Sequence, residues 1–116
     1  MNIEEIVKLI DGKIVSEVQG SHFDVTHAFT SDLMSDVLTV NNSDGIVVLL
    51  TGLANVQTIR TAEMANLNII ILVRGKKANQ DMITIANEND IIVIESKYSA
   101  FRASAVLFNA GIKSLF

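Results

Sequence analysis

Hydrophobic residues near the start of the chain recur with two different spacings. Four aliphatic residues follow one another at intervals of three and four positions, namely Ile3, Ile6, Val7 and Ile10. This spacing places them on one face of a helix, which Asp11-Gly12 is expected to end. Further on, Asp24–Thr30 alternates Val25, His27 and Phe29 with other residues, and this period of two predicts a strand.

Unbroken apolar runs dominate the second half of the chain, at Ile46–Leu50, Ile69–Val73 and Ile91–Ile94. Their centres lie near residues 48, 71 and 93, and each run precedes a helix-like segment, namely Asn55–Asn66, Asn79–Asn89 and Tyr98–Asn109. Strands of this kind are covered by helices on both faces, so the alternation predicts a mostly parallel sheet with right-handed crossovers. We therefore expect one three-layer α/β/α domain over residues 1–116.

Shorter segments complete the prediction. Lys13–Glu17 is a strand candidate, and Ile112–Phe116 is a candidate edge segment. A helix is expected to run through Thr39, with Ser31 or Asp32 at its N-terminal cap, because short oxygen side chains accept from free backbone N–H groups there. Glycine and polar residues predict a loop at Gln19–His22 and a turn at Asn41–Gly45.

Composition narrows the classes of protein. The 116 residues are 49% hydrophobic, the net charge is -4, and there is no cysteine. This excludes a disordered chain, disulfides and thiol chemistry, and it argues against nucleic-acid binding. No apolar run reaches the ~18–20 residues of a membrane span, and the N-terminus lacks signal-peptide features, so a cytoplasmic protein is expected.

The mean hydropathy of +0.39 is high for a protein without a membrane span. Two explanations are open, and we expect both to apply. Several strands are buried on both faces, and one surface is covered by a partner. Since small apolar domains tend to hide a patch and two-fold pairing is the commonest arrangement, a homodimer is expected.

Candidate chemistry lies in the loops that follow the strong strands. In open parallel sheets, ligands bind beyond the carboxyl ends of the strands, near helix N-termini. The expected ligand is a small anion such as a phosphate or carboxylate, with Arg74 and Lys97 supplying positive charge. Backbone and amide contacts are expected from Thr51, Gly52 and Asn55, and hydroxyl contacts from Ser96 and Tyr98. The alternative is ordinary helix capping by Thr51, Asn55, Ser96 and Ser99.

No motif for nucleotide or nucleophile chemistry is present. The chain contains neither a G-x-x-x-x-G-K-[ST] nor a G-x-G-x-x-G run, and it has no G-x-S-x-G elbow. The histidines are His22 and His27, and with Asp24 they form no recognisable ligand cluster, so no metal, cofactor or catalytic residue is predicted. Five larger side chains are interpreted as packing residues. Tyr98, Phe101 and Phe108 are expected to pack a helix, and Met34 and Met64 to lie in the core or an interface.

The segment from Asp24 to Val37 resembles the signature of the DRTGG domain family. Its second half, Ser31-Asp32-Leu33-Met34-Ser35-Asp36-Val37, matches the family run S-D-L-L-S-D-V closely. In the first half Asp24 and Thr26 match, whereas Val25 replaces Arg and His27-Ala28 replace Gly-Gly. Asn55, Ser99-Ala100-Phe101 after Glu95-Ser96, and Gly111-Ile112 also resemble family positions.

The resemblance implies a regulatory α/β domain without established catalytic residues. It implies a fold similar to the N-terminal, non-kinase domain of HPr kinase/phosphorylase, a dimer, and a ligand that includes adenine nucleotides among its candidates. Thr26, Ser31 and Asp32 are then expected to shape the strand-to-helix corner, and together with Asp24, Ser35 and Asp36 they are candidates for the dimer interface. Two alternatives stay open, a scaffold that docks on itself or a partner protein without any ligand, and a small enzyme using His27 or Asp32 as a base.

Overall fold

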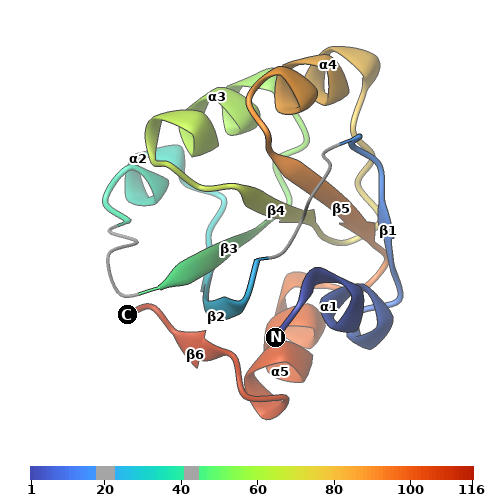
Figure 1. Ribbon diagram of the computed structural model, residues 1–116, viewed down its shortest axis with the longest axis vertical. Helices are drawn as coiled ribbons and strands as arrows, with labels where there is room; N and C mark the ends of the chain where they lie inside the picture. The colour runs from blue at the N-terminus through green and yellow to red at the C-terminus, as the bar shows by residue number, and fades with distance from the viewer. Residues whose placement is uncertain (18–22, 41–44) are drawn as a thin grey trace.

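The computed structural model describes residues 1–17, 23–40 and 45–116. Within these ranges the chain forms one mixed sheet with helices on both faces (Figure 1). The predicted loop at Gln19–His22 and residues 41–44 of the predicted turn lie outside the described residues. The predicted three-layer α/β/α architecture is confirmed.

Six strands make up the sheet in the described part of the chain, in the order β1-β5-β4-β3-β2-β6. Their bounds are β1 Gly12–Ile14, β2 Val25–Thr30, β3 Ile46–Thr51, β4 Ile69–Leu72, β5 Ile92–Ser96 and β6 Lys113–Ser114. The pairs from β5 through β6 are parallel, and β1 is antiparallel to β5. The three apolar runs thus lie side by side in the middle of the sheet, as their composition requires.

Five helices cover the two faces in the same ranges, with bounds α1 Ile3–Leu9, α2 Met34–Val37, α3 Val56–Met64, α4 Gln80–Glu88 and α5 Ala100–Asn109. In Figure 1, α2, α3 and α4 lie above the sheet, whereas α1 and α5 lie below it. Each side has its own buried cluster, one built on α1 and α5 and the other on α2, α3 and α4. Alternate strand residues contribute to opposite clusters, for example Leu50 and Leu49.

The last connection of the chain, from β5 through α5 to β6, places β6 at the edge of the sheet next to β2. After β5, helix α5 passes beneath the sheet, and β6 then pairs with β2 through His27↔Lys113 and Ala28↔Ser114. The predicted edge segment at Ile112–Phe116 therefore forms a short strand. It lies next to the second strand of the chain rather than the fifth, which no sequence pattern indicated.

The two largest differences from the predicted elements concern β1 and α2. The strand expected at Lys13–Glu17 begins at Gly12 and ends at Ile14, because its residues pair with the last residues of β5 from Ile94 to Ser96. The helix expected to begin at Ser31 or Asp32 spans Met34–Val37 alone, and neither predicted residue caps it. The reason lies in the bonds that Asp32 makes elsewhere, which the next section gives.

Several apolar side chains interpreted as packing residues lie on the surface. Phe101 and Phe108 are 86% and 65% exposed, and Met64 is 60% exposed. The helical face of α5 that packs on the sheet is formed by Ala103 and Leu107, both fully buried. The interpretation of Phe101 and Phe108 as helix packing was therefore wrong, since they occupy the opposite, solvent-facing side of α5.

None of the helices in the described ranges has the length and apolarity that a bilayer crossing requires.

Candidate functional site

The carboxyl ends of four parallel strands meet at one edge of the sheet. The register pairs Thr30 with Leu50, Thr51 with Leu72, and Leu72 with Glu95. Backbone bonds continue this alignment past the strand ends, from Val73 N to Thr51 O at 3.0 Å and from Gly75 N to Ser96 O at 2.9 Å. The loops in which the sequence predicted a ligand site are therefore neighbours in space.

Asp32 bridges two of these strand ends. Its carboxylate oxygen Oδ1 accepts hydrogen bonds from Thr51 Oγ1 at 3.0 Å and from the backbone N of Gly52 at 2.7 Å. Thr51 is fully buried, so this contact satisfies a hydroxyl that water cannot reach. Because Asp32 is turned toward β3, it is not available to cap α2, and Leu33 occupies the cap position without a side-chain bond.

Ser31 completes the same corner. Its hydroxyl oxygen accepts from the backbone N of Leu33 at 3.0 Å, which is the geometry of a short side-chain turn rather than of a helix cap. The predicted role of Ser31 and Asp32 in shaping the strand-to-helix corner agrees with these contacts. The corner is a junction between β2 and β3, and it is held by side-chain oxygens.

Most of the polar residues predicted to contact a ligand are engaged in bonds within the protein. Asn55 Oδ1 accepts from Thr58 N at 3.0 Å and so caps α3. Ser96 Oγ donates to Ile10 O at 2.7 Å and accepts from Tyr98 N at 3.1 Å. Together with Thr51 and Gly52, which bind Asp32, these residues support the loops structurally.

Helix capping, the alternative interpretation of these residues, applies to some of them. Asn55 caps α3, and Ser99 caps α5 by accepting from Arg102 N at 3.1 Å. Thr51 and Ser96 instead stabilise the turns that follow β3 and β5, since Thr51 Oγ1 accepts from Leu53 N at 3.2 Å. Gly52 has room for a side chain, because a Cβ there would contact the Asp32 carboxylate at an ordinary 3.5 Å.

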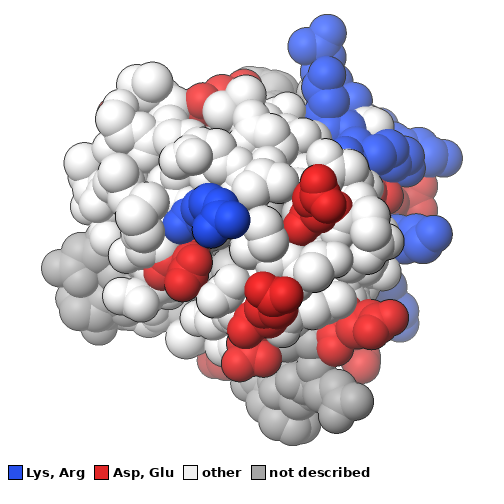
Figure 2. All heavy atoms as spheres, turned by 90° about the horizontal axis from the view of Figure 1, so that it is seen from above, with Lys and Arg blue, Asp and Glu red and all other residues white. Residues whose placement is uncertain are grey.

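Several cationic side chains at this edge are open to solvent. Arg74, Lys76 and Lys97 are exposed and make no ion pair among the residues that the structure describes. Lys77 lies 3.5 Å from Glu95, whose nearly buried carboxylate also accepts from Ala78 N at 2.8 Å. Figure 2 shows Lys and Arg gathered along the right-hand edge, on the side where β5 ends in Figure 1.

Arg102 adds a further cation to this edge. Its guanidinium carbon lies 3.8 Å from the centre of the Tyr98 ring, which is a cation–π contact. The backbone N of Arg74 donates to Tyr98 O at 2.7 Å, so the loops after β4 and β5 are joined at this point. Five of the nine Lys and Arg residues of the chain thus follow β4 and β5, namely Arg74, Lys76, Lys77, Lys97 and Arg102. We call this set the basic edge.

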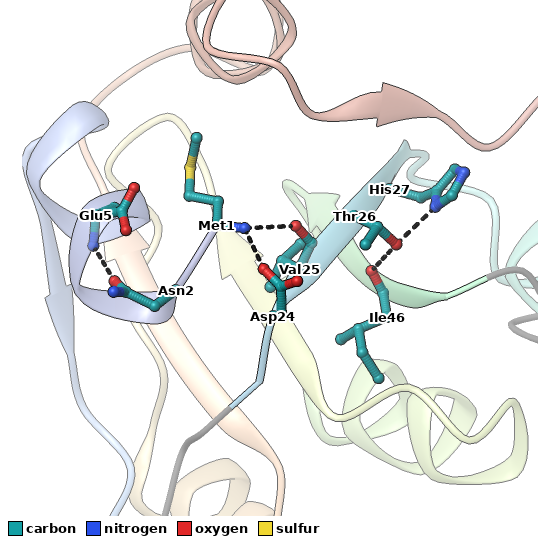
Figure 3. Close-up of polar contacts among 8 residues, drawn as sticks. All are labelled: Met1, Asn2, Glu5, Asp24, Val25, Thr26, His27 and Ile46. Carbon is teal, nitrogen blue, oxygen red and sulfur yellow. Dashed lines mark hydrogen bonds and ion pairs between the residues drawn. The ribbon is translucent and has the colours of Figure 1, made fainter.

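The start of the family-like signature lies at the other end of β2 (Figure 3). Asp24 Oδ1 is 2.5 Å from the amino group of Met1, and Thr26 Oγ1 donates to Ile46 O at 3.3 Å. Since a strand advances about 3.3 Å per residue, the six residues of β2 separate these contacts from the Asp32 corner by roughly 20 Å. The expectation that Thr26 shapes the corner was therefore wrong.

Thr26 instead holds the amino ends of β2 and β3 together. Its hydroxyl is 2.7 Å from His27 Nδ1, and the register shifts between Val25 and His27. Gly45 lies directly against this hydroxyl, with φ at +153°, and a Cβ at that position would lie 2.1 Å from Thr26 Oγ1. A residue with a side chain cannot take this place without displacing Thr26.

The two residues proposed as bases for a small enzyme do not meet. His27 is engaged with Thr26 in β2, whereas Asp32 is engaged with Thr51 and Gly52 beyond its end. Ser35 and Asp36 are exposed on the one-turn helix α2. Over the described ranges no three His, Asp or Glu side chains cluster as metal ligands, and His22 falls outside those ranges.

No protein-family model and no curated protein matches the sequence. A solved structure is similar in fold: the CBS and DRTGG domains of the regulatory region of a Clostridium perfringens pyrophosphatase, complexed with the activator diadenosine tetraphosphate. The TM-score is 0.73 at 13% identity, over 91% of this chain and 45% of that chain. The predicted DRTGG-like fold is confirmed, and this chain spans less than half of the length of that one.

Sequence reasoning missed three features of this region. It did not predict that Asp32 binds the loop after β3, that Glu95 is buried beside Ala78, or that Arg102 lies on Tyr98. The first two join residues on different strand ends, so the partner depends on which strands are neighbours, whereas the third is a local contact after β5. A local signal existed for Asp32, because it directly follows a strand and the parallel pattern placed Thr51 at the same edge.

Proposed function

We propose that this protein is a non-catalytic regulatory module that acts as a homodimer and senses a small anionic ligand. The ligand class is a phosphorylated metabolite, with adenine nucleotides as the first candidates. Its charged groups bind at the basic edge, where Arg74 and Lys97 supply the positive charge. Tyr98 contributes from the same loop as Lys97, and the corner formed by Asp32, Thr51 and Gly52 holds the neighbouring loop after β3 in place.

The observation that carries the proposal is the uneven distribution of charge. The chain as a whole is acidic, with a net charge of -4, yet five of its nine cations follow β4 and β5. Of the carboxylates at this edge, Asp32 and Glu95 are engaged with Gly52 N and Ala78 N, whereas Asp81 in the first turn of α4 is exposed. Exposed cations at the ends of parallel strands suit phosphate oxygens.

The similar fold supports the proposal that this protein has a regulatory role. The pyrophosphatase region has an adenine dinucleotide as its activator, and it combines CBS with DRTGG domains. This chain spans less than half of that region, so its ligand is inferred from its own charges. His27 and Asp32, each a candidate base for the small-enzyme alternative, are given no catalytic role in this proposal.

A thermal-shift screen tests this proposal. The probes are ATP, AMP, diadenosine tetraphosphate, acetyl phosphate and inorganic phosphate. A ligand at about 100 times its dissociation constant stabilises the folded state by about 2.7 kcal/mol, which raises the Tm by roughly 10 °C for a protein of this size. The shift should shrink as salt is added, because exposed charges are screened.

Matched single-charge variants locate the binding site. Lys97→Ala removes an exposed cation of the basic edge, and Arg60→Ala removes an exposed cation from the middle of α3 on the upper layer. We expect Lys97→Ala to reduce the ligand-induced shift and Arg60→Ala to leave it unchanged. Equal losses in both variants would mean that the net charge of the protein, rather than this edge, attracts the ligand.

The second candidate function is a scaffold that dimerises or docks on a partner protein without a ligand. It is favoured by the internal bonds of Asn55 and Ser96, which leave few polar side chains at the strand ends free to contact a ligand. A screen that stays flat at millimolar ligand would contradict the sensing proposal and support the scaffold.

A further inference from the structure

An apolar groove runs between α5 and the edge of the sheet. Its volume is about 470 Å³, and in the described part of the chain it is lined by β2, α5 and the segment around β6. Its floor includes the hydrogen bond between Thr30 Oγ1 and Ser104 Oγ at 2.8 Å. Phe116 closes one side, with its ring 5.4 Å from that of Phe29 in an edge-to-face arrangement.

The solvent-facing side of α5 forms the other wall of this groove. Phe101, Ala105 and Phe108 lie at positions i, i+4 and i+7 and are all exposed. This is the spacing of a helix–helix contact, with a small residue between two aromatic ones. The buried face of α5 is a separate one, formed by Ala103 and Leu107, so the helix is apolar on two sides.

We propose that this face binds a second copy of the same chain, with the two α5 helices packed antiparallel across a two-fold axis. The proposal deepens the homodimer of the proposed function by naming its contact surface. We call this set, Phe101, Ala105, Phe108 and Phe116 with the adjoining groove, the α5 face.

The positions of the phenylalanines fit a self-complementary contact. Phe101 and Phe108 are equally distant in sequence from the midpoint between Ser104 and Ala105. In an antiparallel pair centred there, Phe101 lies opposite Phe108 of the partner subunit, and the reverse contact follows from symmetry. Ala105 lies beside the axis and allows close approach, so an aromatic ring from each copy can enter the groove of the other.

The exposed aromatic rings would supply a large part of the area that a stable dimer buries. Phe101, Phe108 and Phe116 are 86%, 65% and 76% exposed. Since a buried aromatic side chain removes about 150–250 Å² from water, these three rings offer roughly 400 Å² per copy. Two copies would bury roughly 800 Å² through the rings alone, about half of a standard interface of about 1,600 Å².

The small number of charged residues on the α5 face also favours a second copy of the chain as its partner. Lys113 is the one charged residue that lines the groove, and Arg102 is the one charged residue of α5. Arg102 is engaged with Tyr98, away from the phenylalanines. Two acidic copies with a net charge of -4 each would repel through most of their surfaces, whereas the α5 face brings almost no charge together.

A single introduced cysteine tests the contact, because the chain contains none. In Ala105→Cys the two thiols lie beside the axis, so mild oxidation should link the copies covalently. Thr84→Cys is the matched control, since Thr84 is exposed in the middle of α4 on the opposite layer. We expect Ala105→Cys to cross-link about tenfold faster or more, because thiols held in a dimer have a millimolar effective concentration.

A charge variant gives an independent readout of mass. Ala105→Glu would place two carboxylates against each other at the axis, and light scattering or sedimentation should then find a monomer. Thr84→Glu should keep the mass of the unaltered protein. Circular dichroism of both variants shows whether each remains folded, so a monomer caused by unfolding is recognised.

The outcomes separate this contact from the wider function. A dimeric protein whose Ala105→Cys and Thr84→Cys variants cross-link at the same rate would overturn the α5 contact and keep the homodimer. A monomeric mass for the unaltered protein at high micromolar concentration would overturn both. Ligand binding at the basic edge is measured separately by the thermal shift, and it stands or falls independently of either result.

Discussion

Helices α4 and α5 are alike in how they are built and unlike in what they present to solvent. Each begins at a side-chain cap: Asn79 Oδ1 accepts from Met82 N at 2.9 Å, and Ser99 Oγ accepts from Arg102 N at 3.1 Å. Each packs on the sheet through two fully buried residues, Met82 with Ala86 in α4 and Ala103 with Leu107 in α5. Their outer faces differ: α4 exposes Asp81, Thr84 and Glu88, whereas α5 exposes Phe101, Ala105 and Phe108.

This difference separates residues needed for folding from residues available for contact. One apolar face is sufficient for a helix to pack on a sheet, as α4 demonstrates. The second apolar face of α5 adds nothing to the core, because its phenylalanines are largely exposed. The high mean hydropathy of the chain thus has two sources, the buried strands and this surface.

The largest effect is expected from a pair of neighbouring substitutions on α5. Leu107→Ala empties a fully buried site and should lower the free energy of unfolding by about 3 kcal/mol, which lowers the Tm by roughly 10 °C. Phe108→Ala removes a largely exposed ring and should change the stability of the separated subunit by no more than about 0.5 kcal/mol. Urea denaturation at dilute protein concentration measures both.

The comparison of the two helical faces fails if Phe108→Ala is as destabilising as Leu107→Ala under these conditions. Dilution matters here, because dimerisation stabilises the folded state by mass action. At high protein concentration Phe108→Ala should also lower the Tm, and the size of this added loss reports how much the ring contributes to the dimer.

An intermediate effect is expected at the strand-end corner. Asp32→Ala removes the acceptor of two hydrogen bonds and leaves the buried Thr51 hydroxyl without it, so the free energy of unfolding should fall by about 2 kcal/mol. Asp36→Ala is the control, since this exposed residue of α2 should cost no more than about 0.5 kcal/mol. Thermal unfolding followed by circular dichroism compares them. Equal losses would show that the corner depends on acidic charge near α2 rather than on the Asp32 bridge.

The smallest effect is expected at Arg74. This residue has φ at +61°, a left-handed conformation that costs a residue with a side chain about 1–2 kcal/mol and costs glycine little. Arg74→Gly should therefore raise the stability by about 0.5 kcal/mol while removing one cation from the basic edge. The anion-induced thermal shift should fall in the same variant. A loss of stability without ligand would show that the Arg74 side chain supports the loop structurally.

Local patterns were sufficient for most of the fold. The stripe from Ile3 to Ile10 predicted α1, and the runs beginning at Ile46, Ile69 and Ile91 predicted β3, β4 and β5 in a parallel sheet. Periodicity and unbroken β-branched runs report burial directly, so these predictions required no knowledge of neighbours. The carboxyl edge of the sheet also followed from the alternation of strands and helices, and with it the set of loops that carry the basic edge.

Other features depended on contacts between distant segments. The oxygens of Asp32 were equally suited to cap α2 or to bind β3, and the proximity of Gly52 decided between these roles. Likewise, Phe101 and Phe108 have the spacing of core residues. However, α5 has apolar residues on two faces, and the sheet covers only the face that carries Ala103 and Leu107. The amino-acid sequence determined which segments are buried, because burial follows from local hydrophobic spacing. The tertiary structure alone decided which polar groups bind each other and which apolar groups stay exposed, because both depend on what lies opposite.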